Sequence, residues 1–260
     1  MRPVIALLTD FGTQDHYAGA MKGVILGICP DVTLVDISHE IPAHDVLAGA
    51  LELAAVYKYF PAGTIFVAVV DPGVGSARRG VAADTGDYRF IAPDNGVLTQ
   101  VLRDAPAKKI VELTERRYAR PTVSRTFEGR DRFAPAAAWL AKGTQLPALG
   151  RPVTTIHKLD IPSPEAAEDS IRGVVLRVDR FGNLVTNIDR KLVERLGQGI
   201  TIDAAGQRVD RLVATYSELP AEGVGALFGS TDHLELAAPS SSAAARLGLA
   251  RGAVVTVRRA

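Results

Sequence analysis

The chain has 260 residues, of which 47% are apolar and 23% charged, an ordinary balance for a globular protein with one large domain or two modest ones. Its formal net charge of +1 gives no reason to expect nucleic acid or an anionic membrane as a partner, and no apolar run approaches the roughly 18 residues that span a bilayer. A single cysteine, Cys29, excludes an intramolecular disulfide framework and is typical of a reducing compartment. We therefore expect a cytoplasmic protein.

The N-terminal part of the chain predicts alternating strands and helices. Continuous apolar runs suit strands that are covered on both faces, and 3.6-residue periodicity predicts helices. The expected elements are strands at 4–8, 32–37 and 64–70 and helices at 16–27 and 46–59. Asp15 is the expected N-cap of the first helix. Two strand–helix–strand units in so short a span favour a parallel sheet with right-handed crossovers.

The pattern then changes. A hairpin is predicted at 80–85 and 88–92, with helices at 96–103 and 134–142. Residues 159–170 contain two prolines and no apolar periodicity, which indicates a linker. We therefore expect an α/β domain over 1–158, with a mostly parallel sheet and flanking helices.

The C-terminal part, 171–260, predicts a smaller, mostly β domain, either a barrel or a sandwich. Short strand candidates separated by turns lie at 173–178, 184–188, 199–202, 207–213, 224–228, 233–237 and 254–258, with a helical turn at 243–247.

The most informative stretch, 66–79, leads a buried-looking strand into Asp71, two glycines and two arginines. Ligands of open α/β sheets bind beyond the carboxyl ends of the strands, where Asp71 is expected. Asp10, Asp45 and Asp94 occupy similar positions in other loops. Converging carboxylates can bind a cation, a sugar diol, or an ammonium or sulfonium group. The alternative is that each carboxylate caps the following helix or turn.

Familiar motifs do not identify the ligand. The five histidines lack the spacing of metal ligands, and the sequence has no dinucleotide fingerprint, phosphate loop or Gly-x-Ser-x-Gly elbow. A metal-assisted hydrolase that uses the aspartates remains a weaker reading.

Several segments, in order along the chain, resemble one family. They are Leu8-Thr-Asp-Phe-Gly12, Cys29-Pro-Asp-Val-Thr-Leu-Val-Asp36, Val70-Asp-Pro-Gly-Val-Gly75 with Arg78, Pro93-Asp-Asn-Gly96, Thr126-Phe-Glu-Gly-Arg-Asp131 and Asp179-Arg-Phe-Gly-Asn183 with Thr186-Asn187. The chain is identified by this set as similar to the S-adenosyl-L-methionine hydroxide adenosyltransferases, relatives of the fluorinating and chlorinating enzymes.

The resemblance implies an α/β domain joined to a C-terminal β-barrel, and a homotrimer in which the substrate lies between the N-domain of one subunit and the C-domain of its neighbour. It also implies attack of an acceptor on the ribose 5′-carbon of S-adenosylmethionine, with methionine as the leaving group. With water as the acceptor, the products are adenosine and methionine. No metal, cofactor, nucleic acid or membrane is expected to take part.

The resemblance further assigns side chains to parts of the substrate. Methionine leaves readily because its departure neutralises the sulfonium, so the site needs alignment more than acid assistance. Asp10 matches the carboxylate that binds the ribose diol. The other matched positions are Asp15 and Tyr17 beside methionine, Asp94 and Asn95 in the Pro-Asp-Asn-Gly segment, Asp179 for the methionine ammonium, Phe181 and Asn183 for adenine, and Ser230 near the methionine carboxylate.

Water is the acceptor that the resemblance favours. Asp71 and Arg78 match two members of the Asp, Arg and His set that activates water in the hydroxide enzymes. The halogenating relatives carry an uncharged residue at the position of Asp71, where a carboxylate would repel a halide. The extra loop of the fluorinating branch is also missing between Asn95 and Thr126.

Glu128 departs from the family pattern, which has histidine at this position. It can act as a general base, a role worth about 10²–10⁴-fold in rate. It can instead pair with Arg78 and leave Asp71 free to orient water. Or it weakens catalysis, leaving a protein that binds S-adenosylmethionine or adenosine with little or no turnover. Residues 238–240, Ala-Pro-Ser where relatives more often have Val-Asn, are a second departure, at the adenine end.

Overall fold

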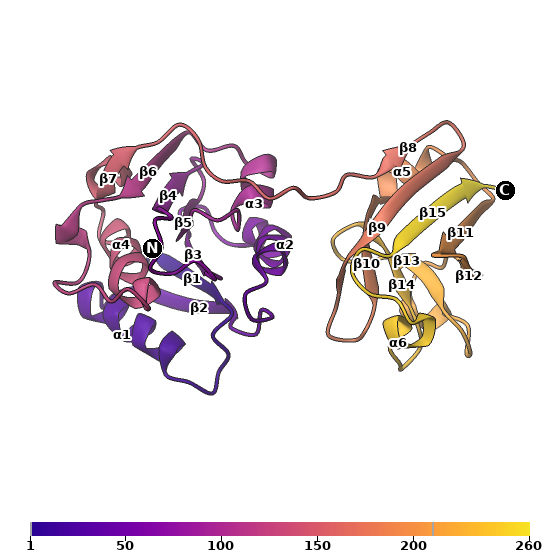
Figure 1. Cartoon of the computed structure of the whole chain (residues 1–260), viewed down its shortest axis with the longest axis horizontal. Helices are drawn as coiled ribbons and strands as arrows, with labels where there is room; N and C mark the ends of the chain where they lie inside the picture. Colours follow the sequence, from indigo (N-terminus) through magenta and orange to yellow (C-terminus); the bar gives the residue numbers. More distant parts are fainter. Residues whose placement is uncertain (1, 210) are drawn as a thin grey trace. The chain divides into compact units, whose positions relative to one another are not determined.

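The computed structural model describes residues 2–209 and 211–260 and divides the chain into two compact units, Met1–Asp160 and Ile161–Ala260 (Figure 1). The expected linker is partly ordered, because β8 (Glu165–Ala166) pairs antiparallel with β9 (Ser170–Val178). Among the described residues, no helix has the length and apolar character needed to cross a membrane.

The first unit is built on a seven-stranded mixed sheet in the order β2-β1-β3-β5-β4-β6-β7. Its strands are β1 (Val4–Thr9), β2 (Thr33–Ser38), β3 (Ile65–Val69), β4 (Gly80–Asp84), β5 (Arg89–Pro93), β6 (Lys109–Leu113) and β7 (Gly150–Pro152). Strands β2, β1, β3 and β5 are parallel, whereas β4, β6 and β7 join by antiparallel pairings.

The expectation of a mostly parallel sheet is therefore right for one half and wrong for the other. The predicted β4–β5 hairpin is confirmed, and it is what reverses the chain direction, because strands joined by a short turn pair antiparallel. Strands β6 and β7 were not predicted. β7 has only three residues, and in β6 the apolar residues are interrupted by Lys109 and Glu112, so neither has the unbroken apolar run of β1 or β3.

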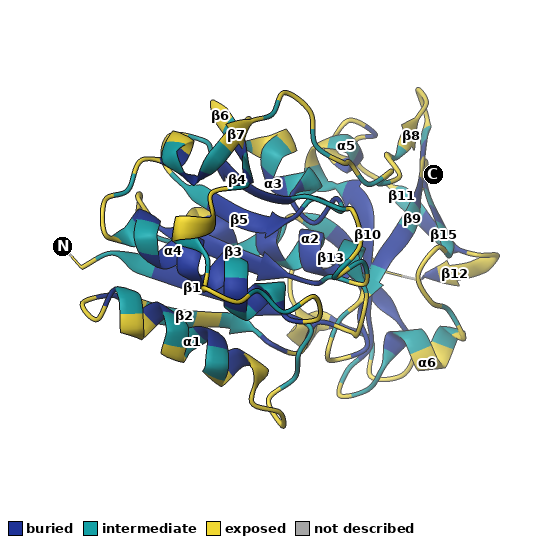
Figure 2. Ribbon diagram, turned by 60° about the vertical axis from the view of Figure 1, so that its left-hand side comes forward, coloured by how far each residue is buried: buried dark blue, intermediate teal, exposed yellow. Residues whose placement is uncertain are grey.

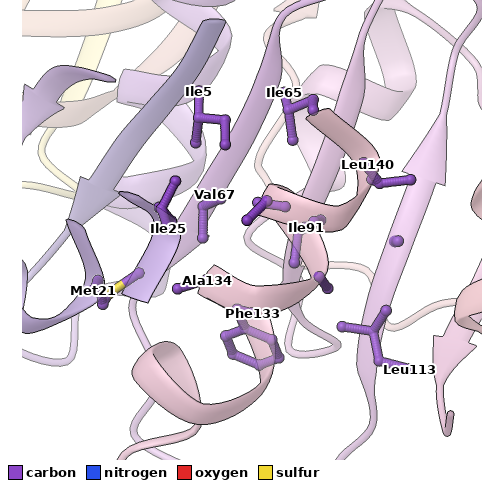
Figure 3. Close-up of a cluster of buried hydrophobic side chains, with 14 of the residues drawn as sticks. Ile5, Met21, Ile25, Ile65, Val67, Ile91, Leu113, Phe133, Ala134 and Leu140 are labelled. Carbon is purple, nitrogen blue, oxygen red and sulfur yellow. The ribbon is translucent and has the colours of Figure 1, made fainter. Parts of the chain in front are cut away.

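Four helices cover the two faces of this sheet. They are α1 (Tyr17–Ile28), α2 (Val46–Val56), α3 (Thr99–Asp104) and α4 (Ala134–Ala141). Alternate residues of β1 belong to two core clusters, Ile5 and Leu7 with α1 and α4, and Ala6 and Leu8 with α2 and α3. Figure 3 shows the first of these clusters. The inner strands read as unbroken apolar runs because both of their faces are buried, as the dark blue of β1, β3 and β5 shows (Figure 2).

Helix α1 begins differently from the prediction. It starts at Tyr17 after His16, and no side chain caps its first turn, so the prediction of Asp15 as N-cap is wrong. Helix α2 does have such a cap, because the Asp45 carboxylate accepts a hydrogen bond of 2.9 Å from the backbone N–H of Ala48. Asp45 therefore has the structural role that its position left open.

The second unit is a barrel-like antiparallel sheet in the order β12-β11-β15-β9-β10-β14-β13, with β8 paired to β9. Its other strands are β10 (Leu184–Asp189), β11 (Ile200–Ala204), β12 (Gln207–Val209), β13 (Gly225–Phe228), β14 (His233–Ala237) and β15 (Val254–Arg259), and its helices are α5 (Arg190–Glu194) and α6 (Ala243–Leu247). Of the strand expected at 207–213, residues 207–209 are observed as β12. Position 210 of the expected strand lies outside the described residues.

Candidate active site

Two of the predicted carboxylates meet at one edge of the first sheet. Thr9 at the end of β1 pairs with Val69 at the end of β3, so Asp10, directly after Thr9, and Asp71, two residues after Val69, leave the same edge of the sheet. Both line a pocket of about 290 Å³. Its other lining residues are Phe11, Tyr17, Ala43, His44, Val69, Val74, Thr126, Phe127, Glu128 and Gly129. The expected position of Asp71 beyond a strand end is confirmed.

An arginine joins the two acids of the predicted water-activating set. Arg78 holds Asp71 through two N–H groups, Nε to Oδ1 at 2.9 Å and Nη2 to Oδ2. The same Nη2 lies 2.5 Å from Oε2 of Glu128, and Arg132 Nη2 lies 3.3 Å from Oε1. Glu128 therefore pairs with Arg78, as one of the alternatives supposed, and Asp71 is bound to the same arginine. Two carboxylates and two guanidinium groups form one electrically balanced array.

Burial makes this array rigid. The side chains of Asp71, Arg78 and Glu128 are 5%, 10% and 14% exposed, and the Arg78 guanidinium also lies over the ring of Phe133 at 5.4 Å. Burial by itself would lower the pKa of Arg78, but the hydrogen bonds and negative charges of Asp71 and Glu128 outweigh it and raise that pKa. Arg78 is therefore a fixed positive charge bound to Asp71 and Glu128, which line the pocket.

Gly75 brings the Glu128 loop against the Arg78 loop. Its φ of +78° is in the left-handed region, and a Cβ at this position would overlap with the backbone carbonyl of Arg125. Arg125 Nη2 in turn donates to the Gly75 carbonyl at 3.1 Å. Glycine at this position thus permits the backbone contact that places Glu128 within reach of Arg78.

Asp131 anchors the same loop from inside. Its fully buried carboxylate accepts two hydrogen bonds from Arg130, at 2.7 and 2.8 Å, and one from the backbone N–H of Ser124 at 2.9 Å. Burial tends to raise the pKa of Asp131, but these hydrogen bonds and the charges of Arg130 and Arg120 lower it overall. The acid of the Gly-Arg-Asp segment therefore holds the loop that carries Glu128.

The other walls of the pocket are backbone and aromatic rings. The carboxylate of Asp10 accepts a hydrogen bond of 2.8 Å from the backbone N–H of His44, which fixes one of its oxygens. Phe11, Tyr17 and Phe127 pack edge to face or tilted, with centroids 5.1 to 5.9 Å apart. This gives an apolar surface beside the charged one, as a nucleoside site requires.

Four predicted residues of this unit do not line the pocket. Arg78 reaches it only through its contacts with Asp71 and Glu128. Asp15 is exposed. Asp94 accepts hydrogen bonds from Arg79, at 2.5 and 2.9 Å, and from the backbone N–H of His157 at 2.7 Å. The Asn95 amide donates to the Val70 carbonyl at 2.8 Å. Asp94 and Asn95 thus bind the chain together, and Asn95 steadies the strand end from which Asp71 projects.

The predicted residues of the second unit do come together. Asp179, Phe181, Asn183 and Ser230 line a pocket of about 1010 Å³. The Asp179 carboxylate accepts hydrogen bonds from the backbone of Phe181 and Asn183 and from the Asn183 amide, at 2.8 to 2.9 Å. This turn leaves the Phe181 ring 78% exposed, which makes it available for stacking.

Sequence reasoning missed three charged or polar groups around these pockets. Arg132 is one helical turn after Glu128, and that i,i+4 spacing was a signal for their ion pair. Glu235, 6% exposed, accepts a hydrogen bond of 2.8 Å from the Tyr216 hydroxyl in the second pocket. Burial and the nearby charge of Asp179 raise the pKa of Glu235. No spacing rule joins residues 216 and 235, so this pair was not visible in the sequence.

A metal site does not emerge from these residues. Over 2–209 and 211–260, no three His, Cys, Asp or Glu side chains gather closely enough to hold a metal ion.

Comparison with known proteins decides the family. Residues 5–150 match the model of the SAM hydroxide adenosyltransferase N-terminal domain, and residues 173–256 match that of its C-terminal domain. The chain belongs to the SAM hydroxide adenosyltransferase family. This confirms the resemblance read from the motifs.

The relatives of this chain include proteins named hydrolase and proteins named fluorinase. It is 39% identical to a protein named (R)-S-adenosyl-L-methionine hydrolase from Thermus thermophilus, over 97% of this chain and 98% of that one. It is 30% identical to a protein named fluorinase from an Actinoplanes species, over 99% and 98%. A crystal structure of an uncharacterized conserved protein from Thermotoga maritima superposes with a TM-score of 0.93 at 31% identity, covering 98% of this chain and all of the other.

We predict that Gly75→Ala displaces the loop that carries Arg78. A Cβ overlaps with the Arg125 carbonyl, in addition to the strain of the left-handed backbone. Overpacking of this kind costs roughly 1–3 kcal/mol. Gly63→Ala is the matched control, because Gly63 also has positive φ, +88°, but open space around it. Urea unfolding should show the larger loss for Gly75→Ala, and equal losses would contradict the proposed contact.

We also predict a pH-dependent effect of Asp131→Asn. Because the pKa of Asp131 is lowered in the folded protein, its carboxylate stabilises the fold above the ordinary aspartate pKa. That stabilisation is lost as the pH falls through the folded-state value. The variant should lose about 1.5–3 kcal/mol at pH 7, the usual range for hydrogen bonds to a charged group. In urea unfolding the difference should narrow from pH 4 downward, and a difference that is constant from pH 7 to pH 3 would refute the assignment.

Proposed function

We propose that this protein hydrolyses S-adenosyl-L-methionine to adenosine and L-methionine by attack of water on the ribose 5′-carbon. The observation that carries the proposal is Asp71, which lines the same pocket as Asp10 and is held there by the buried Arg78. The name of the relative from Thermus thermophilus, which aligns along nearly the whole chain, supports the same reaction.

Asp10 is the proposed holder of the ribose. One of its oxygens is fixed by the His44 backbone, and a carboxylate has enough lone pairs to accept both hydroxyls of a diol in addition. Phe11, Tyr17 and Phe127 offer the apolar surface against which the sugar can be confined. Fixing the ribose in this way aligns its 5′-carbon with the Asp71 side of the pocket, and such alignment supplies much of the rate of a displacement.

Asp71 is the proposed partner of the attacking water. Each Asp71 oxygen accepts one hydrogen bond from Arg78 and keeps a lone pair for water. In the reaction the water oxygen bonds to the 5′-carbon as the carbon–sulfur bond breaks. The electron pair of that bond moves to sulfur and gives neutral methionine, and the proton of the water passes to Asp71. Arg78 holds the Asp71 carboxylate in place beside the attacking water.

Glu128 has a supporting role in this proposal. Both of its oxygens face arginines, Oε2 toward Arg78 and Oε1 toward Arg132. It keeps Arg78 in place and balances its charge. The general-base role of Glu128 read from the sequence is the alternative to this arrangement, and both acids line the pocket.

The second unit is the proposed source of contacts to the rest of the substrate. The exposed Phe181 ring and the Asn183 amide suit adenine, while Asp179 and Ser230 suit the ammonium and carboxylate of methionine. Asp15 stays a proposed methionine contact on the family match alone. We further propose a homotrimer that needs no metal or cofactor, as the family match implies.

Asp71→Asn is the variant that tests the proposal. Loss of the carboxylate that orients and deprotonates water should reduce kcat by about 10²–10⁴-fold. The measurement is adenosine release from chelator-treated protein, followed in water enriched in heavy oxygen. The label should appear at the 5′-hydroxyl of adenosine. Asp31→Asn, an exposed acid outside the pocket, is the control and should retain full activity.

Failure of the wild type to form adenosine while folded and chelator-treated would exclude metal-free hydrolysis. Adenosine without label would exclude attack by water at carbon.

A second function has one observation in its favour. Glu128 stands where the family has histidine, so Arg78 is shared between two acids. This sharing lowers the net positive charge next to Asp71 and the attacking water. The protein would then bind S-adenosylmethionine or adenosine without turning it over. Tight binding by calorimetry with no turnover would select this function, and Glu128→His should then raise kcat. Glu128→Gln is the matched control, because it removes the charge without adding an imidazole.

A further inference from the structure

A buried polar pair lies directly behind Asp10. Thr9 is fully buried, and His39, on the loop after β2, is 6% exposed. Thr9 Oγ1 and His39 Nδ1 are 2.8 Å apart. Neither residue lines the Asp10 pocket, and neither is needed to align the strands, which are already paired through their backbones. Polar groups are costly to bury unless they are bonded, so this pair calls for a reason.

The surrounding groups indicate which member of the Thr9–His39 pair donates the hydrogen bond. His39 Nε2 lies 3.1 Å from Oδ1 of Asp36, whose other oxygen is held by Lys22 Nζ at 2.5 Å. This Nε2 makes no hydrogen bond to any described residue, so its contact with Asp36 is electrostatic, and a nearby negative charge favours the proton on Nε2. Nδ1 is then left to accept from the Thr9 hydroxyl. Thr9 Oγ1 in turn accepts the backbone N–H of Phe11 at 3.2 Å. The contacts thus lead from the surface pair Lys22–Asp36 to the residues on either side of Asp10.

Backbone bonds join the same two loops. Gly12 donates its N–H to the His39 carbonyl at 2.7 Å, and Ile41 donates to the Thr9 carbonyl at 3.4 Å. The His39 loop continues to His44, whose N–H binds the Asp10 carboxylate and whose φ of +66° is unusual for a residue other than glycine. One loop therefore binds the backbone of residues beside Asp10 and, through His44, the Asp10 carboxylate. His39 lies at the start of that loop.

We infer that His39 is a positioning residue that fixes the Asp10 carboxylate by way of Thr9, and so sets the preference of the site for a ribose with both hydroxyls. The inference rests on the proposed function, in which Asp10 binds the diol. Because a displacement of about 1 Å can cost about 10²-fold in rate, a group that never touches the substrate can still control its use.

The test compares replacements that keep different halves of the imidazole. His39→Asn keeps an acceptor near the place of Nδ1 and can still bind Thr9. His39→Gln reaches toward Asp36 instead, and His39→Leu keeps neither contact. Thr9→Val removes the hydroxyl at nearly constant volume. His157→Leu, an exposed histidine of the same unit that meets Asp94 through its backbone, is the control.

The readout is the ratio of kcat/KM for S-adenosylmethionine to that for its 2′-deoxy analogue, with the Kd ratio of adenosine and 2′-deoxyadenosine beside it. The wild type should prefer the ribose compounds by roughly 10- to 100-fold, as loss of a hydrogen bond to a charged group implies. His39→Leu, His39→Gln and Thr9→Val should lose most of that preference, while His39→Asn and His157→Leu should keep it. Thr9→Val with His39→Leu should be no worse than either alone.

A role confined to stability would lower activity toward both substrates and leave the ratio unchanged, which would overturn the inference while the hydrolase proposal stands. A wild type that turns over S-adenosylmethionine without any preference for the 2′-hydroxyl would overturn the role of Asp10 as well. Thr9→Val and His39→Asn keep the test decisive if His39→Leu does not fold.

Discussion

The Arg78 guanidinium, shared between Asp71 and Glu128, is the interaction on which the candidate site depends. Each acid would be costly to keep ionised at this depth without a partner. Arg78 supplies one positive charge for the two acids, and Arg132, beside Glu128, supplies the second. Breaking such an array from one side leaves an uncompensated buried charge. The site is therefore assembled as a whole, with its charges set before any ligand arrives.

The rest of the first unit brings these groups together. Parallel pairing of β1 with β3 puts Asp10 and Asp71 at one edge of the sheet. The left-handed turn at Gly75 lets two loops touch, and the buried Asp131 keeps the second loop folded. Each device is local, but the result is a pocket with a charged wall and an aromatic wall, which is the combination that a cationic nucleoside needs.

The family contains proteins named hydrolase and proteins named fluorinase, and this chain aligns with both almost from end to end. A shared fold therefore does not choose the acceptor, and single positions at the pocket wall do. In the proposed reaction, a negative charge on Asp71 would repel a halide, which favours water as the acceptor. Glu128 then changes the balance around Arg78 without changing the fold, which is why its effect has to be measured on turnover.

Local signals in the sequence were enough for the elements and for part of the site. Apolar runs and helical periodicity located the inner strands and helices because each pattern reports burial on its own segment. The motifs located the family, and Asp10, Asp71, Arg78 and Glu128 with it. The same signals failed for β6 and β7, because neither strand contains an unbroken run of apolar residues. They also failed at Asp15, where a favourable capping residue does not cap.

By itself, then, the sequence determined the two-unit organisation, the family and the identity of the acids at the strand ends. Tertiary structure decided which of them act together. It gave Asp45 and Asp94 structural hydrogen bonds, the first to a helix N-terminus and the second to Arg79. It also paired Glu128 with Arg78 and Arg132, and it placed His39 next to Thr9, the residue before Asp10. The reason is physical: a pattern along the chain reports exposure and backbone preference, whereas a charge or hydrogen-bond network also depends on residues that are distant in the sequence, such as Thr9 and His39, 30 positions apart, meeting in space.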